Sequence, residues 1–87
     1  MKKITINIPE YKKSEGFKFN WQNGFEISFI NKDGQGIIKA NKEGLKSLAN
    51  HLLNMAQDEV PDNYHIHLDD YGSLEEGSNE LIIEKYK

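Results

Sequence analysis

The chain contains neither cysteine nor arginine, and each absence excludes a class of function. Without cysteine there is no disulfide framework, no thiolate zinc site and no cysteine nucleophile, and the reducing cytoplasm is the compartment that fits best. Nucleic acid is not expected to bind the acidic second half of the chain, because phosphate binding needs clustered lysine or arginine and the chain has no arginine at all. We therefore expect a cytoplasmic protein that does not bind nucleic acid.

Long apolar runs are also missing. Residues 4–8 read Ile-Thr-Ile-Asn-Ile, an alternation that is typical of a strand and unlike the continuous apolar run of a signal peptide or a membrane span. We expect no membrane association. The 87 residues, with 37% hydrophobic and 29% charged positions, predict a single small globular domain over residues 1–87, without room for a separate substrate domain.

Charge is distributed unevenly along the chain. Up to Asn50 there are nine lysines against five acids, whereas between His51 and Glu84 there are nine acids and no lysine. Such an acidic half is either a solvated surface that keeps the protein soluble or a docking face for a basic partner. A basic protein is the partner that suits the second interpretation.

The pattern of apolar residues predicts an α+β fold. Strands are expected at about 3–8, 17–22, 24–31, 36–40, 64–69 and 80–86, with one helix at about 42–57. Tight turns are expected at Asn23-Gly24 and Asp33-Gly34, both of type I′, and at Glu75-Glu76-Gly77-Ser78. The order β-β-β-β-α-β-β indicates an antiparallel β-sheet of about six strands with one amphipathic helix packed on one face.

The helix has clear start and stop signals. Asn41 can cap its first turn, Val60-Pro61 follows its end, and Gly44 indicates a close approach to a strand. Its apolar stripe is expected to face the sheet, with Lys46, Ser47, Asn50, Asn54 and Asp58 opposite and His51 pointing away. The stripe consists of Leu45, Leu48, Ala49, Leu52, Met55 and Ala56.

Residues from most of these elements are expected to form the core. Trp21 is interpreted as a core residue rather than a stacking platform, because Phe17 and Phe19 share its face. The predicted core contains Ile6, Phe19, Trp21, Ile27, Leu45, Leu48, Leu52, Ile66, Leu68 and Ile83.

Two acids stand where the helix disfavours them. Asp58 and Glu59 follow the C-terminal end of the helix, at the negative end of its dipole. A local rule that is broken without evident compensation is a reason to suspect function at that place.

The segment Tyr64 to Asp70 carries the most chemically suggestive pattern. Alternation places His65, His67 and Asp69 on one face of a strand, where two imidazoles and a carboxylate can bind metal, move protons or recognise a partner. A zinc or iron site needs further ligands and a second shell, and only one other histidine remains. We therefore expect no bound metal and no cofactor, with a small metal-binding or metalloenzyme module as the alternative.

Other catalytic patterns are absent from the sequence. Gly34-Gln35-Gly36 joins two strands rather than preceding a helix, so it is not a phosphate loop. Ser73 and Ser78 lie in turns with no signal of an oriented base or an oxyanion hole. We expect a protein that is not an enzyme.

The second half of the chain resembles a family of small bacterial immunity proteins of polymorphic toxin systems, the immunity protein thirty-two type. The resemblance runs from Asn41 to Tyr86, and it implies a non-enzymatic inhibitor that binds and neutralises a toxin made by the same or a sibling cell. The first forty residues carry no matching motif. The similar segments are Lys-Glu-Gly-Leu-Lys-Ser-Leu-Ala-Asn-His-Leu-Leu at 42–53, Val60-Pro61, His-Ile-His-Leu-Asp at 65–69 and Gly-Ser-Asn-Glu-Leu-Ile-Ile-Glu at 77–84.

We expect the protein to dock an acidic surface onto a basic protein such as a toxin domain. The short connection after the helix is expected to bring the acids toward one region, and Tyr64, Tyr71 or Leu74 would supply apolar anchors where exposed. A small structural or regulatory interaction domain would show the same pattern. The expected partner-binding residues are Asp58, Glu59, Asp62, His65, His67, Asp69, Asp70, Tyr71, Glu75 and Glu76.

Overall fold

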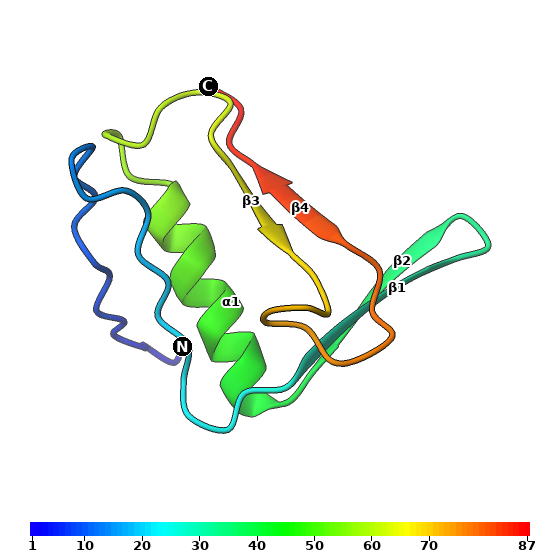
Figure 1. The fold of residues 1–87 in the computed structure, drawn as a ribbon. Helices are drawn as coiled ribbons and strands as arrows, with labels where there is room; N and C mark the ends of the chain where they lie inside the picture. The colour runs from blue at the N-terminus through cyan, green and yellow to red at the C-terminus, as the bar shows by residue number, and fades with distance from the viewer.

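The computed structural model describes all 87 residues and has an α+β architecture (Figure 1). Four strands form two separate antiparallel pairs, β1 with β2 and β3 with β4, and a single helix lies beside them. The elements are β1 (Ile27–Lys32), β2 (Gln35–Ala40), α1 (Lys42–Met55), β3 (His65–Leu68) and β4 (Leu81–Glu84).

The β1–β2 hairpin closes at the turn that the sequence predicts. Asp33 and Gly34 have φ values of 54° and 76°, and a type I′ turn requires positive φ at both of its central residues. The register pairs Lys32 with Gln35 beside this turn. The prediction of a hairpin at Asp33-Gly34 is confirmed.

The β3–β4 hairpin shows the predicted alternation. Ile66 and Leu68 are 5% and 2% exposed and face the core, while His65 and His67 are exposed on the other face. Ile66 lies opposite Ile83 in the register. The hairpin therefore has one apolar face and one wet face, as antiparallel sheets commonly do.

Residues 69–79, which we call the acidic loop, connect β3 to β4. Leu74 in this loop is 5% exposed and belongs to the core cluster with Ile27, Leu48 and Leu68. The amide of Glu75 donates to the carbonyl of Ile27 at 2.8 Å, and that of Asn79 donates to the carbonyl of Phe29 at 2.8 Å. The outer edge of β1 is therefore covered by a loop rather than by another strand.

Residues 3–8 and 17–22 are not strands, so the expected single sheet of about six strands is wrong. The amide of Phe25 donates to the carbonyl of Gln22 at 3.1 Å, which makes a turn at Asn23-Gly24. Only Gly24 of these two residues has positive φ, at 83°, so the turn is not type I′ and builds no hairpin. Residues 1–22 instead run along α1 as a segment that we call the strap (Figure 1).

The helix buries polar side chains against the strap. Ser47, Asn50, His51 and Asn54 are at most 5% exposed, although the sequence predicts them on the solvent side. Their burial follows from the missing strands, because the strap has no neighbouring strand to satisfy its backbone groups. We call these four residues, together with Gln57, the polar ladder.

The upper part of the polar ladder bonds the backbone of residues 18–22. Each ladder side chain takes the place of a partner strand, since it pairs with an amide or carbonyl that a sheet would otherwise bond. The bonds run from the Gln22 amide to Ser47 Oγ (2.8 Å), from the Asn20 amide to His51 Nε2 (2.9 Å) and from Asn54 Nδ2 to the Lys18 carbonyl (2.9 Å).

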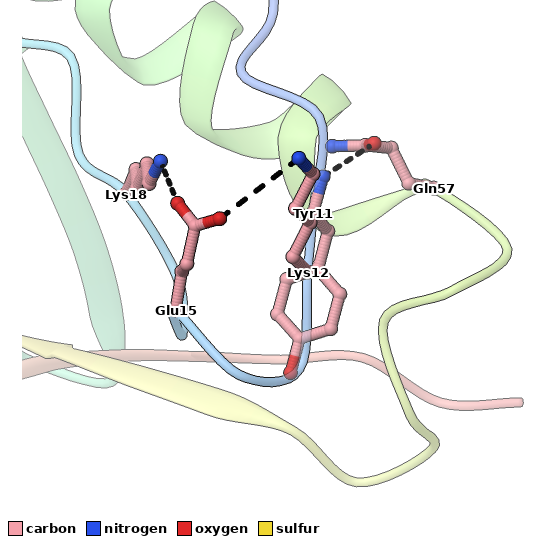
Figure 2. Close-up of polar contacts among 5 residues, drawn as sticks. All are labelled: Tyr11, Lys12, Glu15, Lys18 and Gln57. Atoms are coloured by element: carbon pink, nitrogen blue, oxygen red, sulfur yellow. Dashed lines mark hydrogen bonds and ion pairs between the residues drawn. The ribbon is translucent and has the colours of Figure 1, made fainter.

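The remaining part of the polar ladder holds residues 7–11. Gln57 accepts from the amide of Tyr11 at 3.1 Å through Oε1, a contact visible in Figure 2, and donates to the carbonyl of Pro9 at 2.9 Å through Nε2. Asn50 Nδ2 donates to the carbonyl of Asn7 at 2.9 Å. The strap is thus bonded along most of its length by side chains of one helix and the residue just beyond its cap.

Between Tyr11 and Lys18 the strap turns back on itself. The amide of Gly16 donates to the carbonyl of Lys12 at 3.0 Å, and the carboxylate of Glu15 lies between the ammonium groups of Lys12 and Lys18 (Figure 2). These charged side chains are largely exposed, so the ion pairs contribute little to stability. The turn is therefore secured mainly by its backbone bonds and by Tyr11, which is buried.

The core is smaller than the sequence predicts. Ile27, Leu48, Ile66 and Leu68 are buried, and Trp21 and Ile83 pack partly buried against the core cluster. Ile6 is half-buried. The assignments of Leu45, Leu52 and Phe19 to the core are wrong, because these side chains are 57%, 51% and 44% exposed.

Side chains contact the backbone at the start of the helix and just beyond its end. Asn41 Oδ1 accepts from the amide of Gly44 at 2.8 Å, which confirms the predicted cap. A Cβ on Gly44 would stand 2.5 Å from the carbonyl oxygen of Glu26, so the predicted close approach is also confirmed. At the other end, the ammonium of Lys85 donates to the carbonyls of Gln57 and Val60 at 2.6 and 2.7 Å.

Lys85 supplies the compensation that the helix sequence lacks. The last turn of α1 contains no basic residue, and Asp58 and Glu59 follow it. A cation from β4's continuation lies instead at the negative end of the dipole. The apparent violation at Asp58 and Glu59 is therefore relieved by a tertiary contact and is no reason by itself to suspect function there.

His51 should make the fold sensitive to mild acid. Its side chain is fully buried, and burial lowers the pKa of His51 from 6.5 to about 4. Since the folded state disfavours the proton, the stabilising effect is complete above pH 6.5 and is lost as the pH falls toward 4. The full loss is about 3 kcal/mol, from ~1.4 kcal/mol per pKa unit.

Urea unfolding at several pH values between 6.5 and 4.5 measures this effect. The variant His51→Gln keeps a hydrogen-bond acceptor for the Asn20 amide but cannot titrate, so its stability should fall less over this range. The double variant His65→Gln, His67→Gln, at two exposed positions, serves as the control for loss of histidine side chains. Equal pH slopes for His51→Gln and the parent would contradict the assignment.

Candidate functional site

The exposed face of the β3–β4 hairpin gathers acids and histidines, and we call it the outer face. His65 and Glu84 lie opposite each other in the register, as do His67 and Ile82. His67 Nδ1 lies 3.1 Å from a carboxylate oxygen of Glu80, and both side chains are about half exposed. The outer face therefore combines titratable imidazoles with carboxylates around one exposed isoleucine.

The histidines do not assemble a metal site with Asp69. Their rings lie 5.0 Å apart between centroids, at an angle of 64°. Asp69 Oδ1 accepts from the amide of Tyr71 at 3.2 Å, so this carboxylate is used in the acidic loop. No group of three or more histidine, aspartate or glutamate side chains is arranged to hold a metal ion.

The acidic loop is held rigidly by its own residues and by β1. Asp70 Oδ2 accepts from the amide of Gly77 at 3.3 Å, and the carbonyl of Asp69 accepts from the amides of Gly72 and Leu74. The amide of Phe29 in β1 donates to Ser78 Oγ at 3.2 Å. Four acids of the expected docking set thus lie on a loop whose shape is fixed before any partner binds.

Tyr71 is the exposed aromatic residue of the acidic loop. Its side chain is 98% exposed, whereas Leu74 is 5% exposed in the core. Tyr64 is half-buried and contacts the rings of Tyr11 and Phe17, each at a centroid distance of 6.0 Å. Of the three anchors considered from the sequence, Tyr71 is the one that projects into solvent.

The expected acids form two groups rather than one. Asp58, Glu59 and Asp62 follow α1, near the C-terminus, whereas the acidic loop lies at the opposite end of β3 (Figure 1). The predicted convergence fails because β3 is extended between them, and seven residues of extended chain span roughly 20 Å. The outer face connects the two groups.

Glu80, Ile82 and Glu84 belong to the same surface but were not predicted. All three are exposed, and Glu84 and Ile82 stand beside the histidines across the hairpin. The signal was present in the alternation of residues 80–84, which places every second side chain on the face opposite the core. The register between the strands, which sequence alone does not give, brings them next to His65 and His67.

An aromatic recess opens beside the acidic loop. It has a volume of about 330 Å³ and is bordered on one side by Phe19, Trp21 and Phe25 of the strap and the segment after it. His67 and Asp69 border the other side. The recess therefore offers apolar walls at the rim of an acidic surface, a combination suited to a long side chain with a cationic end.

The comparisons with known proteins identify one family. Residues 37–86, more than half of the chain, match the family model of Immunity protein 32. No curated protein and no solved structure matches the chain. None of its helices is long and apolar enough to cross a membrane.

Zinc titration tests the expectation that His65 and His67 bind no metal. Two imidazoles without a third converging ligand should bind zinc only weakly, so we expect no saturable binding at micromolar concentration by calorimetry. The double variant His65→Ala, His67→Ala serves as the control. Micromolar or tighter binding that this variant abolishes would overturn the expectation and support the metalloenzyme alternative.

Proposed function

Because the chain belongs to the Immunity protein 32 family, we propose that it neutralises a cognate protein toxin by binding it directly. Inhibition by occlusion needs a rigid surface and no catalytic group. The proposal therefore treats the protein as a non-enzymatic inhibitor in the cytoplasm. The partner is a basic toxin domain, whose charge is complementary to the acidic half of the chain.

The observation that carries the proposal is the fixed acidic loop with Tyr71 exposed on it. A loop ordered before binding loses little conformational entropy on association, which strengthens the complex. A tyrosine that is 98% exposed in the free protein gains apolar burial only when a partner covers it. The acids around Tyr71 would select a partner with positive charge.

Long-range electrostatic attraction is the second contribution to binding the toxin. Seven acids of the expected docking set, together with Glu80 and Glu84, lie at the two ends of the outer face and across it. Their combined field should attract a basic toxin and raise the association rate at low salt. The aromatic recess beside Asp69 would then accept a lysine or arginine side chain of the toxin.

The histidines of the outer face lie within the region assigned to the partner. His65 and His67 are exposed there, with Glu84 and Glu80 beside them. The proposal assigns partner contact to the outer face and the acidic loop, with Asp58, Glu59 and Asp62 at its far end.

Charge reversal on the acidic loop tests the electrostatic part. The double variant Glu75→Lys, Glu76→Lys should slow association with the toxin domain and flatten its salt dependence, because both carboxylates are exposed and hold no loop bond through their side chains. We expect roughly a tenfold lower association rate at low salt by surface plasmon resonance. Stability to urea should change little.

A matched reversal serves as the control. Glu10→Lys, Glu15→Lys changes the net charge equally at exposed positions on the strap, away from the acidic loop. It should affect association less than the loop variant. Equal rates for the two double variants, or a toxin bound equally well by both and by the parent, would show that the acidic loop is only a solvated surface.

Tyr71 tests the apolar part independently. Truncation by Tyr71→Ala should raise the dissociation rate by about 30-fold, the equivalent of ~2 kcal/mol for a central aromatic anchor. Tyr86→Ala, at another exposed tyrosine, is the matched control and should change the rate less. Protection of cells that express the toxin should weaken in parallel. An unchanged dissociation rate for Tyr71→Ala would remove this residue from the interface.

A further inference from the structure

The outward side of α1 is an apolar face that the strap and the hairpins cover only at its borders, where residues 4–6 of the strap lie beside Leu45 and Ala49. Leu45, Leu52 and Leu53 are 57%, 51% and 47% exposed. On a helix these positions lie on one side with Ala49 and Ala56, opposite the polar ladder. We call the five residues the leucine face. A helix side with three exposed leucines is a site where another apolar surface is expected to bind.

Strand β4 presents an open hydrogen-bonding edge. The amide of Lys85 donates to the carbonyl of Tyr64, and the carbonyl of Lys85 accepts from the amide of Asn63, so both groups point toward β3's side of the hairpin. In an antiparallel ladder alternate residues point both backbone groups the same way, so those of Ile82 and Glu84 point away from β3. No loop or strand pairs with this edge, because β3 and β4 form a sheet of two strands.

The leucine face and the β4 edge are neighbours. A groove of about 180 Å³ is lined by Leu52 and Ala56 of α1 on one side and by Ile83 and Glu84 on the other. Any strand that pairs with β4 would therefore lie next to the exposed leucines. A single partner could cover both features at once.

We propose that the partner is a second copy of this chain, related by a two-fold axis. Strand β4 pairs antiparallel with β4 of the second copy, and the two leucine faces pack together on one side of the resulting four-stranded sheet. Neighbouring strands lie about 4.8 Å apart, so equivalent points of two adjoining two-stranded hairpins are about 10 Å apart. Packed helices are separated by about 8–10 Å, so one arrangement satisfies both contacts.

Charge along the helix favours this antiparallel arrangement. Lys42 and Lys46 lie at the N-terminal end of the leucine face and are exposed, whereas Asp58 and Glu59 lie beyond its C-terminal end. A two-fold axis reverses one helix relative to the other. It therefore brings the cationic end of each copy toward the acidic end of its partner, which a parallel arrangement would not do.

The proposed interface shares only Asp58 and Glu59 with the surface assigned to the toxin. Ile66 and Leu68 point from β3 toward the core on the helix side, and His65 and His67 point the opposite way. A dimer formed through the helix side therefore leaves the outer face and the acidic loop accessible. Each dimer would display two such surfaces.

Analytical ultracentrifugation of the full chain tests the proposal. The expected species has twice the monomer mass of 10.0 kDa. Leu52→Glu places a carboxylate in the apolar contact twice per dimer and should raise the dissociation constant roughly 100-fold. Ile38→Glu is the matched control, because Ile38 is 47% exposed on β2, whose outer edge is also open. It should leave the dimer intact.

The strand contact is tested separately by Ile82→Pro. The amide of Ile82 points away from β3, so proline there removes no bond of the monomer but one of the proposed dimer. Ile82→Val is its control and should still dimerise. Circular dichroism and urea unfolding identify any variant that fails to fold, and Leu52→Glu then remains as the informative change.

Charge reversal tests the orientation. Lys46→Glu should weaken the dimer, and adding Glu59→Lys should restore part of the lost affinity, because the two positions face each other across the two-fold axis. A monomeric parent protein at 100 μM, or a dimer lost in Ile38→Glu but kept in Leu52→Glu, would overturn the proposal. A dimer indifferent to Ile82→Pro would overturn the strand contact.

Discussion

The structure depends on the need to satisfy the backbone of a segment that has no partner strand. Buried amides and carbonyls must find hydrogen bonds, and the strap finds them on Ser47, Asn50, His51, Asn54 and Gln57. Because these side chains must face the strap, the opposite side of the helix, which carries the leucine face, is turned to solvent. The burial of the polar ladder and the exposure of the leucine face are two results of one constraint.

His51 shows a disadvantage of this constraint for the stability of the fold. Its ring accepts from the Asn20 amide through Nε2, and it is surrounded by aromatic rings, with that of Trp21 at a centroid distance of 4.3 Å. Nδ1 then carries the proton and has no partner. A neutral N–H without a partner is tolerated there, whereas an imidazolium would lose its hydration among the aromatic rings. The same ring that secures the strap also limits the pH range of the fold.

Local signals predicted the elements that depend on a few residues close in sequence. Asp33-Gly34, the cap at Asn41, the close approach at Gly44 and the alternation at 65–68 each follow from nearby chemistry, and the structure contains all four. The strap was missed because Phe17, Phe19 and Trp21 alternate as a strand would. Which side of the helix is buried was not predicted, because asparagine, serine and histidine side chains usually face water. Their hydrogen-bond partners in the strap lie more than twenty residues away in the sequence.

Residue patterns identify candidate surface residues but not how those residues are arranged. The acids and histidines are on the surface, yet their division into two groups depends on β3, and the inclusion of Glu80 and Glu84 depends on strand register. Periodicity gives the face of a side chain but not its neighbour across a hairpin. The rigidity of the acidic loop could not be read from sequence either, since it depends on bonds to β1.

The polar ladder also determines which positions of the chain tolerate substitution. The polar ladder bonds backbone amides and carbonyls of the strap, and these groups are present whatever the side chain at that position. Most strap positions that the ladder bonds are therefore free to vary in residue type. The ladder residues cannot vary in the same way, because each bonds the strap through an atom of its own side chain. All five lie within residues 37–86, the part that matches the family, and the strap lies outside it. Relatives can therefore keep the same helix while the segment bound to it diverges in sequence.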